Sequence, residues 1–190
     1  YFCTGGQNAG EMWTPRRELA ARRGDKNQEH CTVYNMIRLA DYLLRWTGDS
    51  RYADYIERNL YNGILAQQHP VTGQVTYFLP MQAGGRKLWG SPTNDFWCCH
   101  GTLVQAHAGH PRHIYFKDAA GLRVAQYIPS ELKTEWNGVA VRIALSLDPR
   151  RADLHLPRAW QIKLAVECAR PVKFSLKLRL PEWLAGPARL

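Results

Sequence analysis

The hydrophobic pattern changes its period once along the chain, and this change constrains the fold more than any other feature. Between residues 32 and 68, apolar side chains recur every three or four positions, as they do on amphipathic helices. After Lys117, apolar and polar residues alternate, which is typical of half-buried antiparallel strands. The sequence therefore predicts helices in the first part of the chain and strands in the second.

Two helices are expected in the first part. The first covers about residues 32–47 and ends at Gly48, because glycine readily takes the left-handed conformation that closes a helix. Asp49 or Ser50 can cap the second helix, which continues to about residue 68. The short connection predicts that the two helices form an antiparallel pair.

The rest of the chain is predicted from turn residues and alternation. Residues 74–97 lack a period and are rich in Gly and Pro, so we expect a loop with at most a short strand at 75–79. A third helix is expected from Cys99 to about His110. The expected strands form a β-sandwich or meander and cover residues 122–128, 139–147, 162–166 and 172–180, with turns at Asp118–Gly121, Asn137-Gly138 and Asp148-Pro149.

Composition excludes several classes of protein. Of the 190 residues, 45% are hydrophobic and 22% are charged, which excludes a disordered chain and allows a real core. No apolar run reaches the roughly 18 residues that cross a bilayer, so no membrane span is expected in this segment. The chain begins at Tyr1 without a signal-peptide pattern. We therefore expect a fragment or a processed product.

The net charge of +9 is spread over both parts of the chain. A basic surface attracts polyanions, but no nucleic-acid-binding motif accompanies the charge. A solvated basic face is therefore the preferred interpretation, and nucleic acid is not an expected partner. One group of cations is dense, although Glu18 and Asp25 interrupt it; its members are Arg16, Arg17, Arg22, Arg23 and Lys26.

The five cysteines are an odd number and do not suggest a disulfide scaffold. Cys98 and Cys99 are adjacent, and could face one ion from a loop or bend at Gly101, or pack as small buried side chains. Glu29 and Cys31 lie at the start of the first helix, where an anion is stabilised. Three sulfurs and one carboxylate are a ligand set suited to Zn²⁺. His30 and His100 are alternative ligands, and spacing does not choose between them.

Three further features could carry chemistry. Glu11 follows a glycine-rich run, where backbone can approach a ligand, and could act as a general acid/base or be an exposed loop residue. Three histidines have helical spacing, but Pro111 interrupts them and disfavours a metal site. Four tryptophans near the loops could stack on sugar rings or pack in the core. The histidines are His107, His110 and His113, and the tryptophans are Trp13, Trp46, Trp89 and Trp97.

These motifs occur in an order that resembles one enzyme family, the β-L-arabinofuranosidases of glycoside hydrolase families 127 and 146, the second more closely. The resemblance runs from Tyr1 to about Leu132, and 178–183 resemble a later strand. Its landmarks are Gly10-Glu11, Glu29-x-Cys31-x-x-Tyr34-Asn35-Met36, the run from Tyr52 to Asn62, Phe96-Trp97-Cys98-Cys99-x-Gly101-Thr102, and Ile128-Pro129-Ser130-Glu131.

The resemblance implies an (α/α)₆ barrel followed by β-sandwich domains. Residues 1–117 are then expected to be the C-terminal part of the catalytic barrel, and residues 118–190 the start of the β-sandwich domain. Family members are several times longer than this chain, so the first part of the barrel is expected to be missing, and the chain alone is expected to be inactive.

The resemblance also implies roles for individual residues. It makes Glu29, Cys31, Cys98 and Cys99 the Zn²⁺ ligands, with Cys98 as the nucleophile and Glu11 as the general acid/base. A metal-bound thiolate then replaces the second carboxylate of an ordinary retaining glycosidase. The implied activity is removal of terminal β-L-arabinofuranosyl residues from plant glycans with retention of configuration.

Two positions depart from the family pattern. His30 stands where the family usually has Thr, and its side chain is expected to point away from the ion. Gln105 stands where related sequences usually have Glu, which removes a charge and could alter substrate choice. The alternative function is a non-catalytic carbohydrate-binding protein with a structural zinc. Compartment and oligomeric state stay open.

Overall fold

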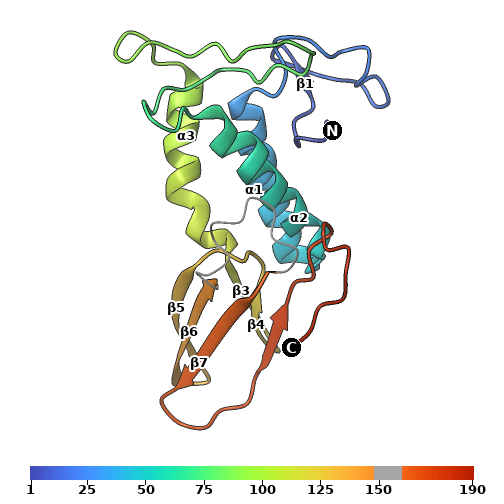
Figure 1. Cartoon of the computed structure of the whole chain (residues 1–190). Coiled ribbons are helices and arrows are strands. Elements are labelled where there is room, and N and C mark those ends of the chain that lie inside the picture. The colour runs from blue at the N-terminus through green and yellow to red at the C-terminus, as the bar shows by residue number, and fades with distance from the viewer. Residues whose placement is uncertain (148–159) are drawn as a thin grey trace. The chain divides into compact units, whose positions relative to one another are not determined.

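The computed structural model describes residues 1–147 and 160–190. The chain divides into two compact units, one of residues 1–110 with 181–190 and one of residues 111–180. The first unit holds the three α-helices and the second holds two three-stranded sheets (Figure 1). The predicted turn at Asp148-Pro149 lies outside the described residues. The predicted domain limits, 1–117 and 118–190, stay a prediction.

The predicted helix pair is confirmed. Helix α1, His30–Thr47, ends at Gly48, which has a φ of 69° and donates its N–H to the Leu44 carbonyl. Helix α2, Ser50–Asn59, starts after Asp49, whose side chain accepts the N–H of Arg51 at 2.9 Å. The two helices lie side by side in the first unit (Figure 1). No helix in the described ranges is long and apolar enough to cross a membrane.

The second helix changes its winding before the expected end. A π-turn, η1, covers Leu60–Ile64, and a 3₁₀ turn, η2, covers Leu65–Gln67. A Cβ at Gly63 would lie 2.7 Å from a methyl group of Val33, so only glycine lets this turn pack directly against α1. The turn also exposes the Asn62 carbonyl, which accepts the Gln28 side-chain amide at 2.8 Å. This contact fixes the segment that leads into α1.

The third helix starts one residue earlier than predicted. The loop or bend predicted at Gly101 is wrong. Helix α3, Cys98–Gly109, contains both adjacent cysteines in its first turn, and Gly101 lies inside it.

The short strand predicted at 75–79 does not form. This segment makes isolated bridges instead, each with a different part of the chain: Gln68 with Val75, Thr76 with Trp89, and Asn27 with Leu79.

The second unit contains two sheets, in the orders β3-β4-β8 and β5-β6-β7. The second sheet is antiparallel, as predicted, but β4 and β8 are parallel, so the expectation of antiparallel strands throughout is wrong. A parallel pair needs a long crossover, which the intervening strands provide. The strands are β3 Tyr115–Asp118, β4 Gly121–Val124, β5 Ser130–Trp136, β6 Val139–Leu147, β7 Ile162–Cys168 and β8 Ser175–Leu178.

The core of the second unit is shared by the two sheets. Leu122 of β4 packs with Trp136 of β5 and with Val141 and Ile143 of β6, all at most 7% exposed. Every second residue of β6 from Val139 to Leu145 is buried, as the alternation predicted. Two sheets that share a core are compatible with the start of a β-sandwich. The three helices of the first unit are compatible with part of an (α/α)₆ barrel, but they do not form a closed one.

Candidate metal centre and active site

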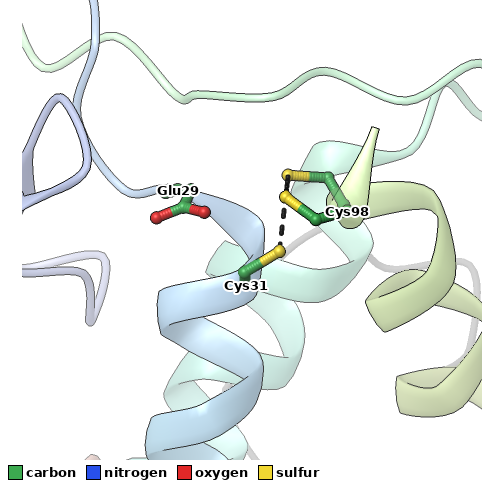
Figure 2. Close-up of side chains that lie close together, drawn as sticks. Glu29, Cys31 and Cys98 are labelled. Atoms are coloured by element: carbon green, nitrogen blue, oxygen red, sulfur yellow. Dashed lines mark hydrogen bonds between the residues drawn. The ribbon is translucent and has the colours of Figure 1, made fainter. Parts of the chain in front are cut away.

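The four predicted zinc ligands come together in the first unit. One ligand atom from each of Glu29, Cys31, Cys98 and Cys99 lies within 4.8 Å of all the others. Glu29 is the N-cap residue of α1 and Cys31 lies in its first turn, while the other two cysteines begin α3. Figure 2 shows the Cys31 side chain pointing from α1 toward Cys98. The positive ends of two helices therefore meet at one cluster of anionic ligands.

The spacing of the sulfur atoms fits a tetrahedral metal ion. The Cys31 and Cys99 sulfurs are 3.8 Å apart, and those of Cys98 and Cys99 are 4.0 Å apart. Zn–S bonds of about 2.3 Å in a tetrahedron place two sulfurs about 3.8 Å apart. Three thiolates and one carboxylate can therefore hold Zn²⁺ without a large rearrangement.

The thiols also need a cation to ionise at neutral pH. Burial raises the pKa of the Cys31 thiol to about 11, even though a hydrogen bond with Thr102 lowers it. Burial, and then the proximity of Cys31 and Cys98, raise the pKa of Cys99 well above its ordinary value. Crowded thiols of this kind become ligands when a cation replaces their protons.

We expect the reactivity of Cys31 to report this pKa once the metal is removed. A pKa near 11 instead of 9.0 reduces the thiolate fraction at pH 8 by about 100-fold. Alkylation of Cys31 by iodoacetamide should therefore be slow at pH 8 and accelerate up to about pH 11. Peptide mass spectrometry of the chelated protein measures this rate, with the exposed Cys3 and Cys168 as references. Rapid alkylation of Cys31 at pH 7 would contradict the expectation.

Glu29 is held in place from both sides. Thr32, in the first turn of α1, donates its hydroxyl to the Glu29 carboxylate at 2.9 Å. The Glu29 backbone N–H donates to the side-chain oxygen of Asn8, and Asn27 donates its amide to the Asn8 carbonyl. Asn8 begins the hairpin formed by β1, Asn8–Ala9, and β2, Met12–Trp13. The hairpin is therefore fixed to the segment that carries Glu29.

Glu11 lies at the turn of this hairpin and is exposed. Tyr77 donates its hydroxyl to the Glu11 carboxylate, and the same oxygen lies 3.5 Å from the Cys98 sulfur. The hydrogen bond to Glu11, and then the contact with Cys98, raise the pKa of Tyr77 above its ordinary range. One phenol group therefore connects the two residues for which the family resemblance implies catalytic roles. Tyr77 is the site residue that the sequence analysis missed.

The glycine-rich run packs against protein rather than around an open ligand site. A Cβ at Gly5 would lie 2.5 Å from the Asn59 side chain, and one at Gly6 would lie 2.4 Å from that of Gln28. Gly5 also has a φ of 105°. These two glycines bring the N-terminal segment close to the helices, so the close approach predicted for this run is to side chains of the same unit.

His30 and His100 lie outside the four-ligand cluster. His30 is fully buried, and its Nδ1 lies 2.9 Å from the Thr102 hydroxyl. Burial, and then the charge of His107, lower the pKa of His30 to about 4. The Nδ1 of His100 accepts the backbone N–H of Trp97 at 2.9 Å, which caps α3. Both imidazoles therefore have partners other than the cluster.

The three-histidine site is not found in the described part of the chain, where the Glu29 cluster is the one group able to hold a metal. His107 pairs with the Gln68 side chain at 2.9 Å, and its ring meets the edge of His110. Gln105 accepts the hydroxyl of Tyr34 at 2.8 Å.

The aromatic residues have different surroundings. Trp97 lies against the rings of Tyr77 and His100 at the site, and Trp13 is 55% exposed on β2, two residues after Glu11. Trp46 is 76% exposed and stacks on Tyr42, far along α1 from the ligands. Core packing is therefore not the explanation for Trp46. The remaining tryptophan of the four, Trp89, lies edge-to-face with His69.

The basic group of Arg16, Arg17, Arg22, Arg23 and Lys26 lies on the surface, since all five side chains are exposed.

Comparison with protein families gives two matches. The model described as "Beta-L-arabinofuranosidase, GH127 catalytic domain" matches residues 1–112. The model described as "Beta-L-arabinofuranosidase, GH127 middle domain" matches residues 121–190. No curated protein matches the chain significantly. The descriptions name GH127, and the closer resemblance to family 146 stays a prediction.

Three glycoside hydrolases are among the solved structures that resemble the chain in fold. A GH127 β-L-arabinofuranosidase from Geobacillus stearothermophilus T6 has a TM-score of 0.72 and 24% identity, over 97% of this chain and 30% of that one. A GH127 β-arabinofuranosidase has a TM-score of 0.77 and 22% identity, and the match covers 96% of this chain and 27% of that one. A structure described as a glycoside hydrolase has a TM-score of 0.68 and 20% identity, and the match covers 86% of this chain and 28% of that one. The chain spans less than a third of each of these proteins.

Proposed function

The chain belongs to the GH127 β-L-arabinofuranosidases, and from this we propose that it carries the metal centre and both reactive residues of a retaining glycoside hydrolase. The proposed substrate is a glycan with a terminal β-L-arabinofuranosyl residue, as the names of the family and of the solved structures suggest. The observation that carries the proposal is the contact of one tyrosine hydroxyl with both Glu11 and Cys98.

The proposed ligands of Zn²⁺ are Glu29, Cys31, Cys98 and Cys99. The spacing of the sulfurs and the raised pKa values of the Cys31 and Cys99 thiols support this assignment. The ion, when bound, keeps the Cys98 sulfur as a thiolate at neutral pH and fixes its position. Because the sulfur is already held, less entropy is lost when it meets the sugar.

In the first half of the proposed reaction, the Cys98 thiolate attacks the anomeric carbon. The carbon–oxygen bond to the leaving group breaks as the carbon–sulfur bond forms, and Glu11, in its acid form, gives its proton to the departing oxygen. In the second half, the Glu11 carboxylate takes a proton from water, and this water displaces the Cys98 sulfur from the sugar. Two inversions at one carbon give net retention.

The separation of the two groups supports this assignment. An O–H···O bond is usually about 2.5–3 Å long, so the hydrogen bond of Tyr77 to Glu11 and its 3.5 Å contact with Cys98 place the carboxylate oxygen at most about 6–6.5 Å from the sulfur. Retaining glycosidases place their two reactive groups about 5–5.5 Å apart. The arrangement therefore suits direct attack by Cys98 better than attack by an intervening water.

We expect Tyr77→Phe to lower kcat/KM by about 10- to 100-fold, because the phenol hydroxyl holds the Glu11 carboxylate beside Cys98. The phenylalanine ring keeps the packing against Trp97. The matched control is Tyr55→Phe, which removes a hydroxyl that donates to the Gly5 carbonyl. Steady-state kinetics on an aryl β-L-arabinofuranoside measures kcat/KM of both variants. Equal kinetics of the two variants would contradict a role for Tyr77.

The test of the proposed function is release of L-arabinose from an aryl β-L-arabinofuranoside by the full-length protein that contains this chain. The protein is reduced and loaded with Zn²⁺. We expect catalytic release, and no release would overturn the proposal. Binding of the arabinoside without turnover would favour the alternative, a carbohydrate-binding protein with a structural metal.

A further inference from the structure

His30 lies between two proposed ligands in the sequence, but its side chain turns toward α3. It is fully buried, and its Nδ1 is 2.9 Å from the hydroxyl oxygen of Thr102. Its other ring nitrogen, Nε2, is buried and has no hydrogen-bond partner among the described residues. A buried imidazole bonded on one side only calls for an explanation.

The unpaired nitrogen indicates which nitrogen carries the proton. A neutral imidazole has one N–H and one lone pair. Buried N–H groups are very rarely left without an acceptor, whereas unpaired acceptors are less rare. The favoured tautomer therefore has its proton on Nδ1 of His30 and its lone pair on Nε2. In this tautomer His30 donates to the Thr102 oxygen.

The Thr102 hydroxyl then has its own proton to donate. Its oxygen lies 3.4 Å from the Cys31 sulfur, and 3.3 Å from the carbonyl oxygens of Cys98 and Cys99. A distance of 3.3 Å is long for an O–H···O bond, which is usually about 2.7–2.8 Å. Sulfur is a larger atom, so 3.4 Å is an ordinary distance for it, and a thiolate is the strongest acceptor of the three.

We propose that His30 and Thr102 form a hydrogen-bond relay that donates to the Cys31 thiolate and keeps this sulfur an unreactive ligand while Cys98 reacts. This inference rests on the proposed metal site. Three thiolates and one carboxylate around a divalent cation leave an excess of two negative charges. A hydrogen-bond donor to one sulfur offsets part of this excess negative charge and strengthens metal binding.

The relay also makes the two cysteines different. Cys31 receives a hydroxyl that is itself polarised by a buried imidazole. The hydroxyl beside Cys98 belongs to Tyr77, which donates to Glu11. A thiolate that accepts a hydrogen bond is less electron-rich and a poorer nucleophile. His30 and Thr102 therefore act as positioning residues through Cys31, and leave Cys98 as the more reactive sulfur.

The test is the absorption spectrum of the full-length protein loaded with Co²⁺ in place of Zn²⁺. Thiolate-to-cobalt charge transfer depends on the electron density of the sulfurs, so it reports the relay without any turnover. We expect Thr102→Val to shift this band to lower energy and to weaken Co²⁺ binding by about 10- to 100-fold. Thr102→Ser keeps the hydroxyl, so its band should match that of the parent protein.

A second variant keeps the test informative if Thr102→Val does not fold. His30→Phe retains a buried ring but removes the donor, so we expect a smaller band shift in the same direction. An unshifted band in a folded variant of either kind would overturn the relay while leaving the metal site in place. A parent protein without a thiolate band would overturn the metal site and the relay together. A shifted band without arabinosidase activity would support the relay and count against the proposed substrate alone.

Discussion

Replacing Cys98 with alanine is expected to reduce kcat/KM on an aryl β-L-arabinofuranoside by at least about 10⁴-fold, as loss of a covalent nucleophile does in other hydrolases. In the proposed mechanism the variant lacks the atom that attacks the anomeric carbon. No second thiol is expected to replace it, because Cys31 and Cys99 are half-buried and buried proposed ligands in the first turns of α1 and α3. Steady-state kinetics of the full-length protein, loaded with zinc, measures the loss. A Cys98→Ala variant with full activity would contradict the mechanism.

Cys98→Ala also removes a proposed zinc ligand, so two controls accompany it. Cys3→Ala removes an exposed thiol of the same unit and should leave kinetics within about twofold of the parent, as surface changes usually do. Glu11→Gln removes the acid/base but no proposed ligand, so it should abolish most turnover while the zinc content stays at one ion per chain. If Glu11→Gln lost its zinc, the division between ligands and acid/base would be wrong.

Removal of the metal is expected to have the second largest effect. The cluster joins the first turns of α1 and α3 through Cys31 and Cys99, whose sulfurs are 3.8 Å apart. An ion at 1,000 times its dissociation constant stabilises the folded state by about 4 kcal/mol. Chelation should therefore lower the free energy of unfolding of the full-length protein by about this amount and abolish turnover. Urea denaturation with and without chelator measures the change.

The matched variants for this prediction are Cys99→Ala and Cys168→Ala. Cys99 is fully buried in the cluster, whereas Cys168 is exposed at the end of β7 in the other unit. Cys99→Ala should reproduce the effect of chelation and respond no further to chelator, because the ion is already weakly held. Cys168→Ala should behave like the parent. Unchanged zinc content in Cys99→Ala would contradict the ligand assignment.

Part of the site could be predicted from residue types alone. A carboxylate and a thiol at the start of a helix, with two further thiols elsewhere, indicated a metal cluster, and the structure brings these four groups together. The sequence did not choose between them and the histidines. That choice depends on contacts of the folded chain: His30 meets Thr102 of another helix, and His100 accepts the Trp97 N–H and caps α3.

Tyr77 could not be predicted because it lies in a segment without a period. Its carbonyl accepts the backbone N–H of His30 and the side-chain amide of Gln67. Single contacts between irregular segments hold it in place, and contacts of this kind leave no repeating pattern in the sequence. Glu11 is placed in a similar way, through Asn8 and Asn27.

The strands show what alternation of apolar and polar residues can and cannot predict. Val139–Leu147 alternates over nine residues and forms β6 as expected. Alternation defines which face of a strand is buried but not the direction of its neighbour, so the parallel pairing of β4 with β8 was missed. Ser130–Trp136 was not predicted as a strand, because its buried face carries a threonine beside Leu132 and Trp136.

The central claim is that the Cys98 sulfur bonds to the sugar during turnover. An aryl 2-deoxy-2-fluoro-β-L-arabinofuranoside tests it most directly, since the fluorine slows breakdown of a covalent intermediate. The zinc-loaded full-length protein is incubated with this compound, digested, and mapped by mass spectrometry. We predict one arabinosyl group on the peptide that contains Cys98, and none in Cys98→Ala. A label on Glu11 or Glu29, or turnover of the unfluorinated glycoside with no label on Cys98, would contradict the account.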